Sequence, residues 1–346
     1  GLVALLMLLP ALAALPPLEG RADIWMDWPM GAPSTWDIIA LAILSLTGIS
    51  FLWLLAIPDL AAARDHMPPS GRRDLISKLS LGWTGYSRQW RIHRLGALIL
   101  GGVYLLTYPL IQTLITSDFS AGLIPGLKDA IYPAFMTLAG LQGGVGIVLV
   151  TMFILRRSGG YANYISMDQF WSLSKPLLAF SLLWFYFWWS SFITFWYGKM
   201  PSEVSVIQLL FLEPYREVFI ASLFLNFLGP LLALMWSPVR KSVWGPSLVG
   251  LGVVIGAFLN MIRLYVSAFS IENVNGHLLE TVPGGQWPEA PDILIAIGGI
   301  AAPVLLFFLV SKVVPVISIW EVAEGLKLTK VRTLLGRQVR VIAKSH

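Results

Sequence analysis

Cysteine is absent from the 346 residues of this chain. That absence excludes disulfide bonds, thiolate-ligated iron–sulfur clusters and thioether-attached haem within the chain. Charged residues are also scarce, at 12 % of the sequence, which is about half the share of a soluble domain. Hydrophobic residues make up 56 %. The composition therefore indicates an integral membrane protein.

Histidine is nearly absent as well, and the four histidines are His66, His93, His277 and His346. Only His93 lies near a long apolar segment, so the chain cannot assemble the two facing axial histidines of a membrane b-type haem. Metal-ligand sets, nucleotide-binding glycine patterns and nucleophile triads are also missing from the sequence. We therefore expect no independent catalysis and no metal bound by this chain.

Long apolar runs recur along most of the chain. A membrane-spanning helix needs roughly 20 mostly apolar residues, and its backbone must be hydrogen-bonded within the segment. The runs are too long and too evenly apolar for the strands of a membrane barrel. The sequence therefore predicts an all-α, polytopic membrane helical bundle of about eight transmembrane helices. Their predicted spans are 1–18, 36–62, 92–114, 130–155, 173–197, 214–236, 246–268 and 292–315.

Positive charge alternates between successive loops. The segment 63–94 carries seven arginines and lysines, whereas the loop 269–291 carries none. The positive-inside rule therefore predicts that the basic loops and the C-terminal tail lie in the cytoplasm. The net charge of +5 reflects this topology and does not indicate nucleic-acid binding.

The chain is expected to have three regions. Residues 1–90 hold N-terminal transmembrane segments and a basic cytoplasmic loop, 91–315 form the helical membrane core, and 316–346 form a basic cytoplasmic tail. The first residue is Gly rather than Met. We therefore expect an N-terminal part to precede residue 1.

Ionisable side chains near the apolar segments are the candidates for function, because burying a charge in a membrane is costly. Asp118 follows the third segment and Arg263 lies in the seventh, both near the predicted outer face. The two side chains could form a structural salt bridge or bind a polar headgroup such as a quinone carbonyl. Gln112, Asp118 and Arg263 are therefore the candidate quinol-binding residues.

A proton relay is a second interpretation of the polar side chains. Its candidate residues are Asp118, His93, Asp168, Lys175, Tyr186 and Arg263. The alternative is that His93, Asp168 and Lys175 lie at the headgroup level. For Tyr186, the alternative is an ordinary hydrogen bond between helices.

Several stretches resemble the polysulfide-reductase membrane-subunit (NrfD-like) family, as it occurs in alternative complex III. Residues 175–204 resemble the aromatic helix of that family, which ends in Trp-Tyr and is followed by Pro-x-Glu. Here these residues are Trp196, Tyr197, Pro201 and Glu203. Residues 91–140 are similar to the family's helix pair joined by an aspartate-bearing loop, with Asp118 at the aspartate. Weaker likeness occurs at 224–242 and in the ending VPVISIWEV.

The resemblance implies four-helix-bundle architecture and a set of partners. These are a homologous NrfD-like membrane subunit and periplasmic iron–sulfur and multihaem cytochrome c subunits. Haem c and iron–sulfur clusters would belong to those partners, and this chain alone would bind no redox cofactor. Family members that bind quinol place a histidine six residues before the aspartate, where this chain has Gln112. That departure favours the ActF-type subunit over the quinol-binding ActC-type.

Three functions remain as hypotheses. The first is a membrane subunit of a quinol-oxidising complex, with a scaffold role and a candidate proton-conducting role. The second is that the chain itself binds menaquinol or ubiquinol. The third is a stand-alone secondary transporter, which the position of the polar groups toward helix ends disfavours, because transporters usually bind substrate at mid-membrane.

Overall fold

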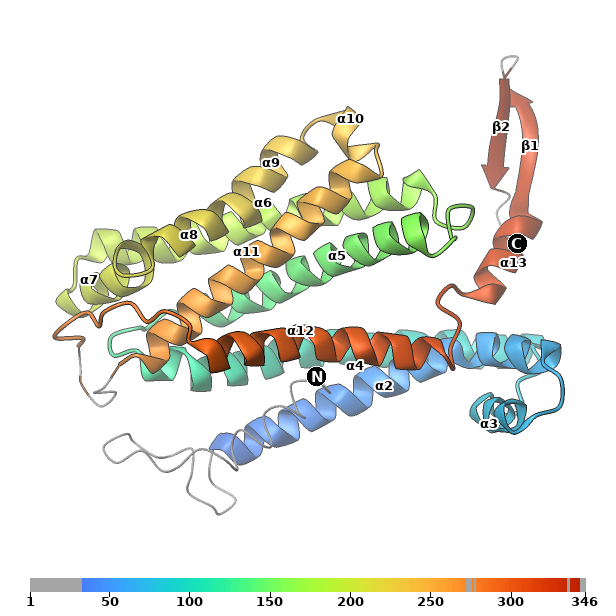
Figure 1. Cartoon of the computed structure of the whole chain (residues 1–346), viewed down its shortest axis with the longest axis horizontal. Coiled ribbons are helices and arrows are strands. Elements are labelled where there is room, and N and C mark those ends of the chain that lie inside the picture. Colours follow the sequence, from blue (N-terminus) through green and yellow to red (C-terminus); the bar gives the residue numbers. More distant parts are fainter. Residues whose placement is uncertain (1–32, 272–275, 277, 335–336, 343–346) are drawn as a thin grey trace. The chain divides into compact units, whose positions relative to one another are not determined.

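The computed structural model describes residues 33–271, 276, 278–334 and 337–342. Among these residues, seven helices are long and apolar enough to cross a membrane (Figure 1). They confirm seven of the eight predicted spans, and the predicted span 1–18 lies outside the described residues. The chain is therefore a polytopic membrane protein of the all-α class.

The spanning helices extend past the predicted limits at most ends. They are α2 (Pro33–His66), α4 (Ser87–Phe119), α5 (Tyr132–Ser158), α6 (Met167–Gly198), the continuous run of α8 (Arg216–Leu223), η3 (Phe224–Leu228) and α9 (Gly229–Leu234), α11 (Trp244–Phe269) and α12 (Ala290–Ser311). The shorter elements are α3 (Gly71–Leu79), η1 (Ala121–Leu123), α7 (Pro201–Ile207), η2 (Gln208–Leu212), α10 (Ser237–Arg240) and α13 (Ile319–Leu328). Both η2 and η3 are π-helical turns, which are often found at functional sites.

The observed end of α4 differs from the predicted one and changes the position of Asp118. The sequence predicts a helix that ends before this residue, whereas α4 continues to Phe119 and places Asp118 in its last turn. A polar residue at the end of a helix lowers the local hydropathy without breaking the backbone hydrogen bonds. The apolar run is therefore shorter than the helix.

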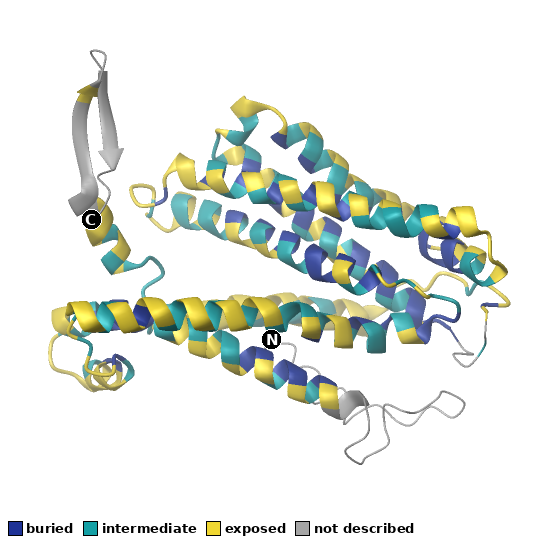
Figure 2. Ribbon diagram, turned by 180° about the vertical axis from the view of Figure 1, so that it is seen from behind, coloured by how far each residue is buried: buried dark blue, intermediate teal, exposed yellow. Residues whose placement is uncertain are grey.

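The residues form two units of mutually contacting segments. Among the described residues, unit 2 consists of 33–40 and 107–287 without 272–275 and 277, and its helices α5, α6, α8, α9 and α11 run side by side. Their facing sides are buried, as the dark blue segments of Figure 2 show. The backbones of α5 and α11 approach closely, because a Cβ atom on Gly146 would lie only 2.7 Å from the Gly250 carbonyl oxygen. Small residues at a helix crossing permit this contact in membranes.

Among the described residues, unit 1 consists of 41–106, 288–334 and 337–342. In this unit, α2 and α4 pack through glycines, with Gly101 against the ring of Phe51. Asp59 of α2 is buried and its Oδ1 accepts the backbone N–H groups of Ile319 and Trp320, at 2.7 and 3.1 Å. These contacts satisfy two of the free N–H groups at the start of α13.

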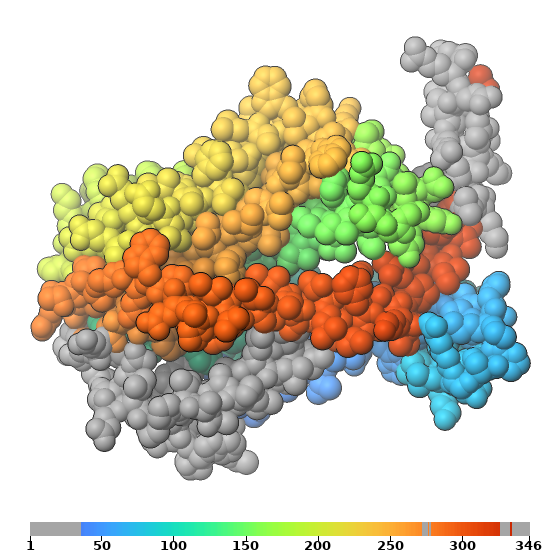
Figure 3. Space-filling model, viewed as in Figure 1, coloured from blue at the N-terminus to red at the C-terminus, as the bar shows by residue number. Residues whose placement is uncertain are grey.

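Two features of the C-terminal part were not predicted. No residue of α12 is buried, and its side chains form the orange ridge in the space-filling view (Figure 3). Beyond α13, the backbone forms an antiparallel hairpin of β1 (Thr329–Leu334) and β2 (Arg337–Ile342), with Thr329 opposite Ile342. The predicted basic tail therefore contains regular structure.

Candidate functional site

A group of polar side chains gathers where α4 ends, α5 begins and α11 ends, all within unit 2. Gln112 donates a hydrogen bond to the Thr116 hydroxyl at 3.2 Å. The buried Thr116 also hydrogen-bonds with the hydroxyl of Tyr265 on α11. Ser120 shares a 2.7 Å hydrogen bond with the hydroxyl of Tyr132. We call this group the polar cluster. Its members are Asp37, Gln112, Thr116, Asp118, Ser120, Tyr132 and Tyr265.

Asp37 and Asp118 give the polar cluster a pair of carboxylates. Asp37 is 0 % exposed, and neither of its carboxylate oxygens has a hydrogen-bond partner among the described residues. Asp118 is partly buried and lies within electrostatic range of Asp37. Two neighbouring carboxylates away from water repel each other when both are ionised.

Arg263 is a fully buried cation on α11, with 1 % of its surface exposed. Its Nη2 donates to Asn260 Oδ1 at 2.8 Å, and its Nη1 donates to the carbonyl oxygen of Leu210 in η2. The guanidinium carbon lies 5.1 and 5.2 Å from the ring centres of Phe211 and Phe219. Contact with two aromatic rings stabilises a desolvated guanidinium.

The predicted ion pair between Asp118 and Arg263 is not formed among the described residues. The one salt bridge found there joins Arg64 to Asp65 in α2. Arg263 instead approaches the polar cluster through Tyr132, because both residues line the same small cavity. Of the three candidate quinol-binding residues, Gln112 and Asp118 therefore belong to the polar cluster and Arg263 lies beside it.

Two buried donors share a structural role that the sequence did not predict. Proline removes the N–H group that an α-helix supplies to the carbonyl four residues earlier. In two places, a side chain on another helix donates to such a carbonyl. The pairs are His93 with Leu54 (before Pro58, 3.0 Å) and Gln142 with Asn226 (before Pro230, 2.8 Å). Such replacement bonds are what make proline tolerable inside membrane helices. Arg263 instead donates to Leu210, whose carbonyl lies in the last turn of η2 and has no helical partner there.

His93 is explained by this role and by its aromatic surroundings. It lies in unit 1, 5 % exposed, with the rings of Trp83 and Trp90 at 5.4 and 5.7 Å between ring centres. Because the Leu54 carbonyl can only accept, His93 Nε2 must carry the proton of this hydrogen bond. Whether His93 lies at the headgroup level or in a proton relay stays a prediction.

The other three relay candidates lie on the exposed surface of α6. Asp168 is in the first turn of the helix, and Lys175 places its Nζ 4.1 Å from the ring centre of Trp171. Tyr186 is 60 % exposed. Among the described residues, no hydrogen bond joins any of the three to the polar cluster.

Several residues of interest were not predicted. Asp37 had a sequence signal, since it is an ionisable residue one position inside an apolar segment. Gln142 is 0 % exposed in α5 and also donates to Ser181 of α6 at 2.9 Å. It is the one amide side chain in the largely apolar predicted span 130–155. No local signal indicates which neighbour either side chain would meet.

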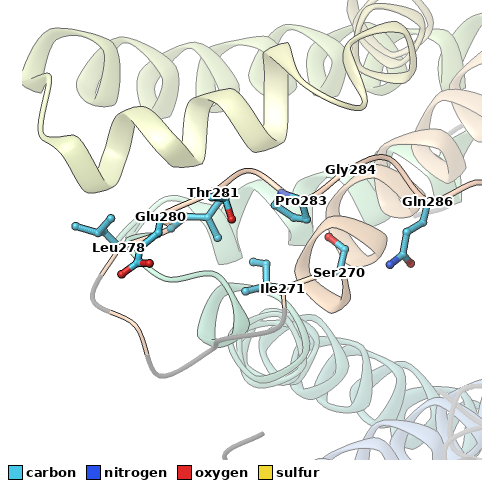
Figure 4. Close-up of a pocket in the computed structure, with 9 residues that line it drawn as sticks. Ser270, Ile271, Leu278, Glu280, Thr281, Pro283, Gly284 and Gln286 are labelled. Atoms are coloured by element: carbon cyan, nitrogen blue, oxygen red, sulfur yellow. The ribbon is translucent and has the colours of Figure 1, made fainter. Parts of the chain in front are cut away.

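A separate polar cavity of about 390 Å³ lies under the loop that follows α11 (Figure 4). The loop is held in place by the backbone N–H of Gln286, which donates to the hydroxyl of Tyr215 at 3.0 Å. Among the residues described as lining this cavity, Glu280 is the one ionisable side chain. The cavity therefore lacks the converging acid–base groups of the polar cluster.

Compared with models of protein families and with curated proteins, the chain matches none.

Proposed function

We propose that this chain is a non-haem membrane subunit of a quinol-oxidising electron-transfer complex like alternative complex III, where it acts as scaffold and conducts protons. The observation that carries the proposal is the polar cluster, which contains the buried carboxyl group of Asp37, the carboxyl group of Asp118 and the hydrogen-bonded hydroxyl groups of Ser120 and Tyr132. Ionisable groups inside a membrane protein are costly and usually mark ion or proton pathways. Carboxyl and hydroxyl groups both accept and donate protons, so the cluster has the chemistry that proton transfer needs.

The choice of complex rests on the family resemblance of residues 91–140 and 175–204. On the basis of this resemblance, the proposed partners are a homologous NrfD-like membrane subunit and periplasmic iron–sulfur and multihaem cytochrome c subunits. The loop residues from Leu278 to Gln286 that line the polar cavity supply a surface for such a partner. The bilayer would be the bacterial inner membrane.

Purification of the tagged chain from its native membrane tests this assembly. We expect it to co-migrate in native gels with bands that stain for haem, because the partner subunits would carry haem c. A tagged multi-pass transporter from the same membrane is the control for non-specific association. Recovery of the chain alone, in mild detergent and at native expression level, would contradict the proposal and favour a stand-alone transporter.

The proposed orientation places the basic loops in the cytoplasm. Reporter tags near residues 75 and 280 should therefore lie on opposite sides of the bilayer, because the positive-inside rule acts on short basic loops. A tag near residue 160, after Arg156 and Arg157, should report the same side as residue 75. If the tags near 75 and 280 report one side, the orientation is wrong.

A further inference from the structure

A cavity of about 30 Å³ lies beside Arg263 inside unit 2. Asp129, Tyr132, Trp188 and Ser191 also line it. A buried water needs at least about 10–15 Å³ of such space and two to four polar partners. The cavity is therefore large enough for a water molecule and too small for an organic ligand.

Unused hydrogen-bond donors border the cavity. Arg263 Nε and Trp188 Nε1 are buried and have no hydrogen-bond partner among the described residues. The other two guanidinium nitrogens of Arg263 are engaged by Leu210 and Asn260. A buried N–H group without a partner is costly, so both donors require an acceptor in the cavity.

Asp129 supplies the negative charge at this cavity. Asp129 is partly buried, and its Oδ1 accepts the backbone N–H of Ile131 at 2.9 Å. A carboxylate offers about four lone-pair positions, so Asp129 retains capacity for further hydrogen bonds. It is the carboxylate among the described residues that line the cavity with Arg263. A cation buried away from water needs such a negative partner.

We propose that one water molecule in this cavity joins Arg263 to Asp129 as a water-separated ion pair. The water accepts from Arg263 Nε and Trp188 Nε1 and donates to the Asp129 carboxylate. Asp129 is then the counter-charge of Arg263, in place of the predicted Asp118. Because Tyr132 lines the same cavity, the pair also links the loop before α5 to the polar cluster. This pairing does not depend on the proposed function.

A double-mutant cycle on the full chain in lipid nanodiscs tests the pairing. We expect Asp129→Asn to lower the Tm by at least about 2 °C in the wild-type background and to have little effect when Arg263→Gln is already present. Asp118→Asn is the matched control carboxylate, and its Tm shift should be equal in both backgrounds. An Asp129→Asn shift that is equal in both backgrounds would overturn the proposal.

A second measurement applies even if the Arg263 variant does not fold. A wild-type structure that resolves waters should show one density peak within hydrogen-bond distance of Arg263 Nε, Trp188 Nε1 and the Asp129 carboxylate. Direct contact between Arg263 and Asp129, a dry cavity, or bromide density after exchange of chloride for bromide would each overturn it. Neither measurement uses turnover, so a failure here is distinct from a failure of the proposed function.

Discussion

Replacing Asp118 with asparagine is expected to lower the proton-coupled turnover of the assembled complex by roughly tenfold or more, because a positioned proton-transfer group contributes about 10²-fold or more. Asparagine preserves the size of the side chain and removes the proton that the carboxyl group can carry. The loss should appear in the steady-state rate of quinol oxidation coupled to proton release. Asp37→Asn should cause a similar loss, because Asp37 is the other carboxyl group of the polar cluster and is fully buried.

Asp168→Asn provides the matched control for this experiment. It is the same chemical change at an exposed carboxylate in the first turn of α6, with no described bond to the polar cluster. We expect its turnover to equal that of the wild type. If Asp118→Asn retains full turnover and an unchanged pH response, Asp118 does not belong to a proton route.

Replacing Gln142 with leucine is expected to destabilise the protein by about 1–3 kcal/mol, which is the cost of leaving a buried acceptor unpaired. Leucine fills a similar volume and removes the donor to the Asn226 carbonyl, which precedes Pro230 by four residues. The bond to Ser181 is lost as well. Thermal unfolding of the purified chain in nanodiscs would measure the change.

Gln112→Leu is the corresponding control. Gln112 is partly buried and donates to the hydroxyl of Thr116, one turn later on its own helix. No proline-freed carbonyl depends on it, so the variant should unfold near the wild-type temperature. Equal losses for the two variants would mean that the proline-freed carbonyl at Asn226 has no special need of Gln142.

The secondary structure was largely readable from the sequence. Seven apolar segments predicted seven spanning helices, because the length and apolarity of a span are local properties. The errors lie at the polar ends, as at Asp118, where the helix continues into residues that no longer resemble the membrane interior. The hairpin beyond α13 was missed because a basic segment was treated as a tail.

The site was only partly predictable. Gln112 and Asp118 were named, and both lie in the polar cluster, whereas Asp37 was not. Arg263 was recognised as unusual, although its partners, Leu210 and Asn260, were not foreseen. Partner choice depends on how each helix is rotated and which neighbour it meets, and one sequence does not contain that information.

The sequence by itself determined that this is a membrane protein and which segments span the bilayer. The reason is that each apolar run in lipid must form its backbone hydrogen bonds within its own helix. Only the tertiary structure decided which polar groups meet. It assigned His93 and Gln142 to carbonyls freed by proline and Arg263 to a carbonyl at the end of η2, and it brought Asp37 within electrostatic range of Asp118. The physical reason is that the cost of a buried polar group is set by its neighbours, and helix packing chooses those neighbours.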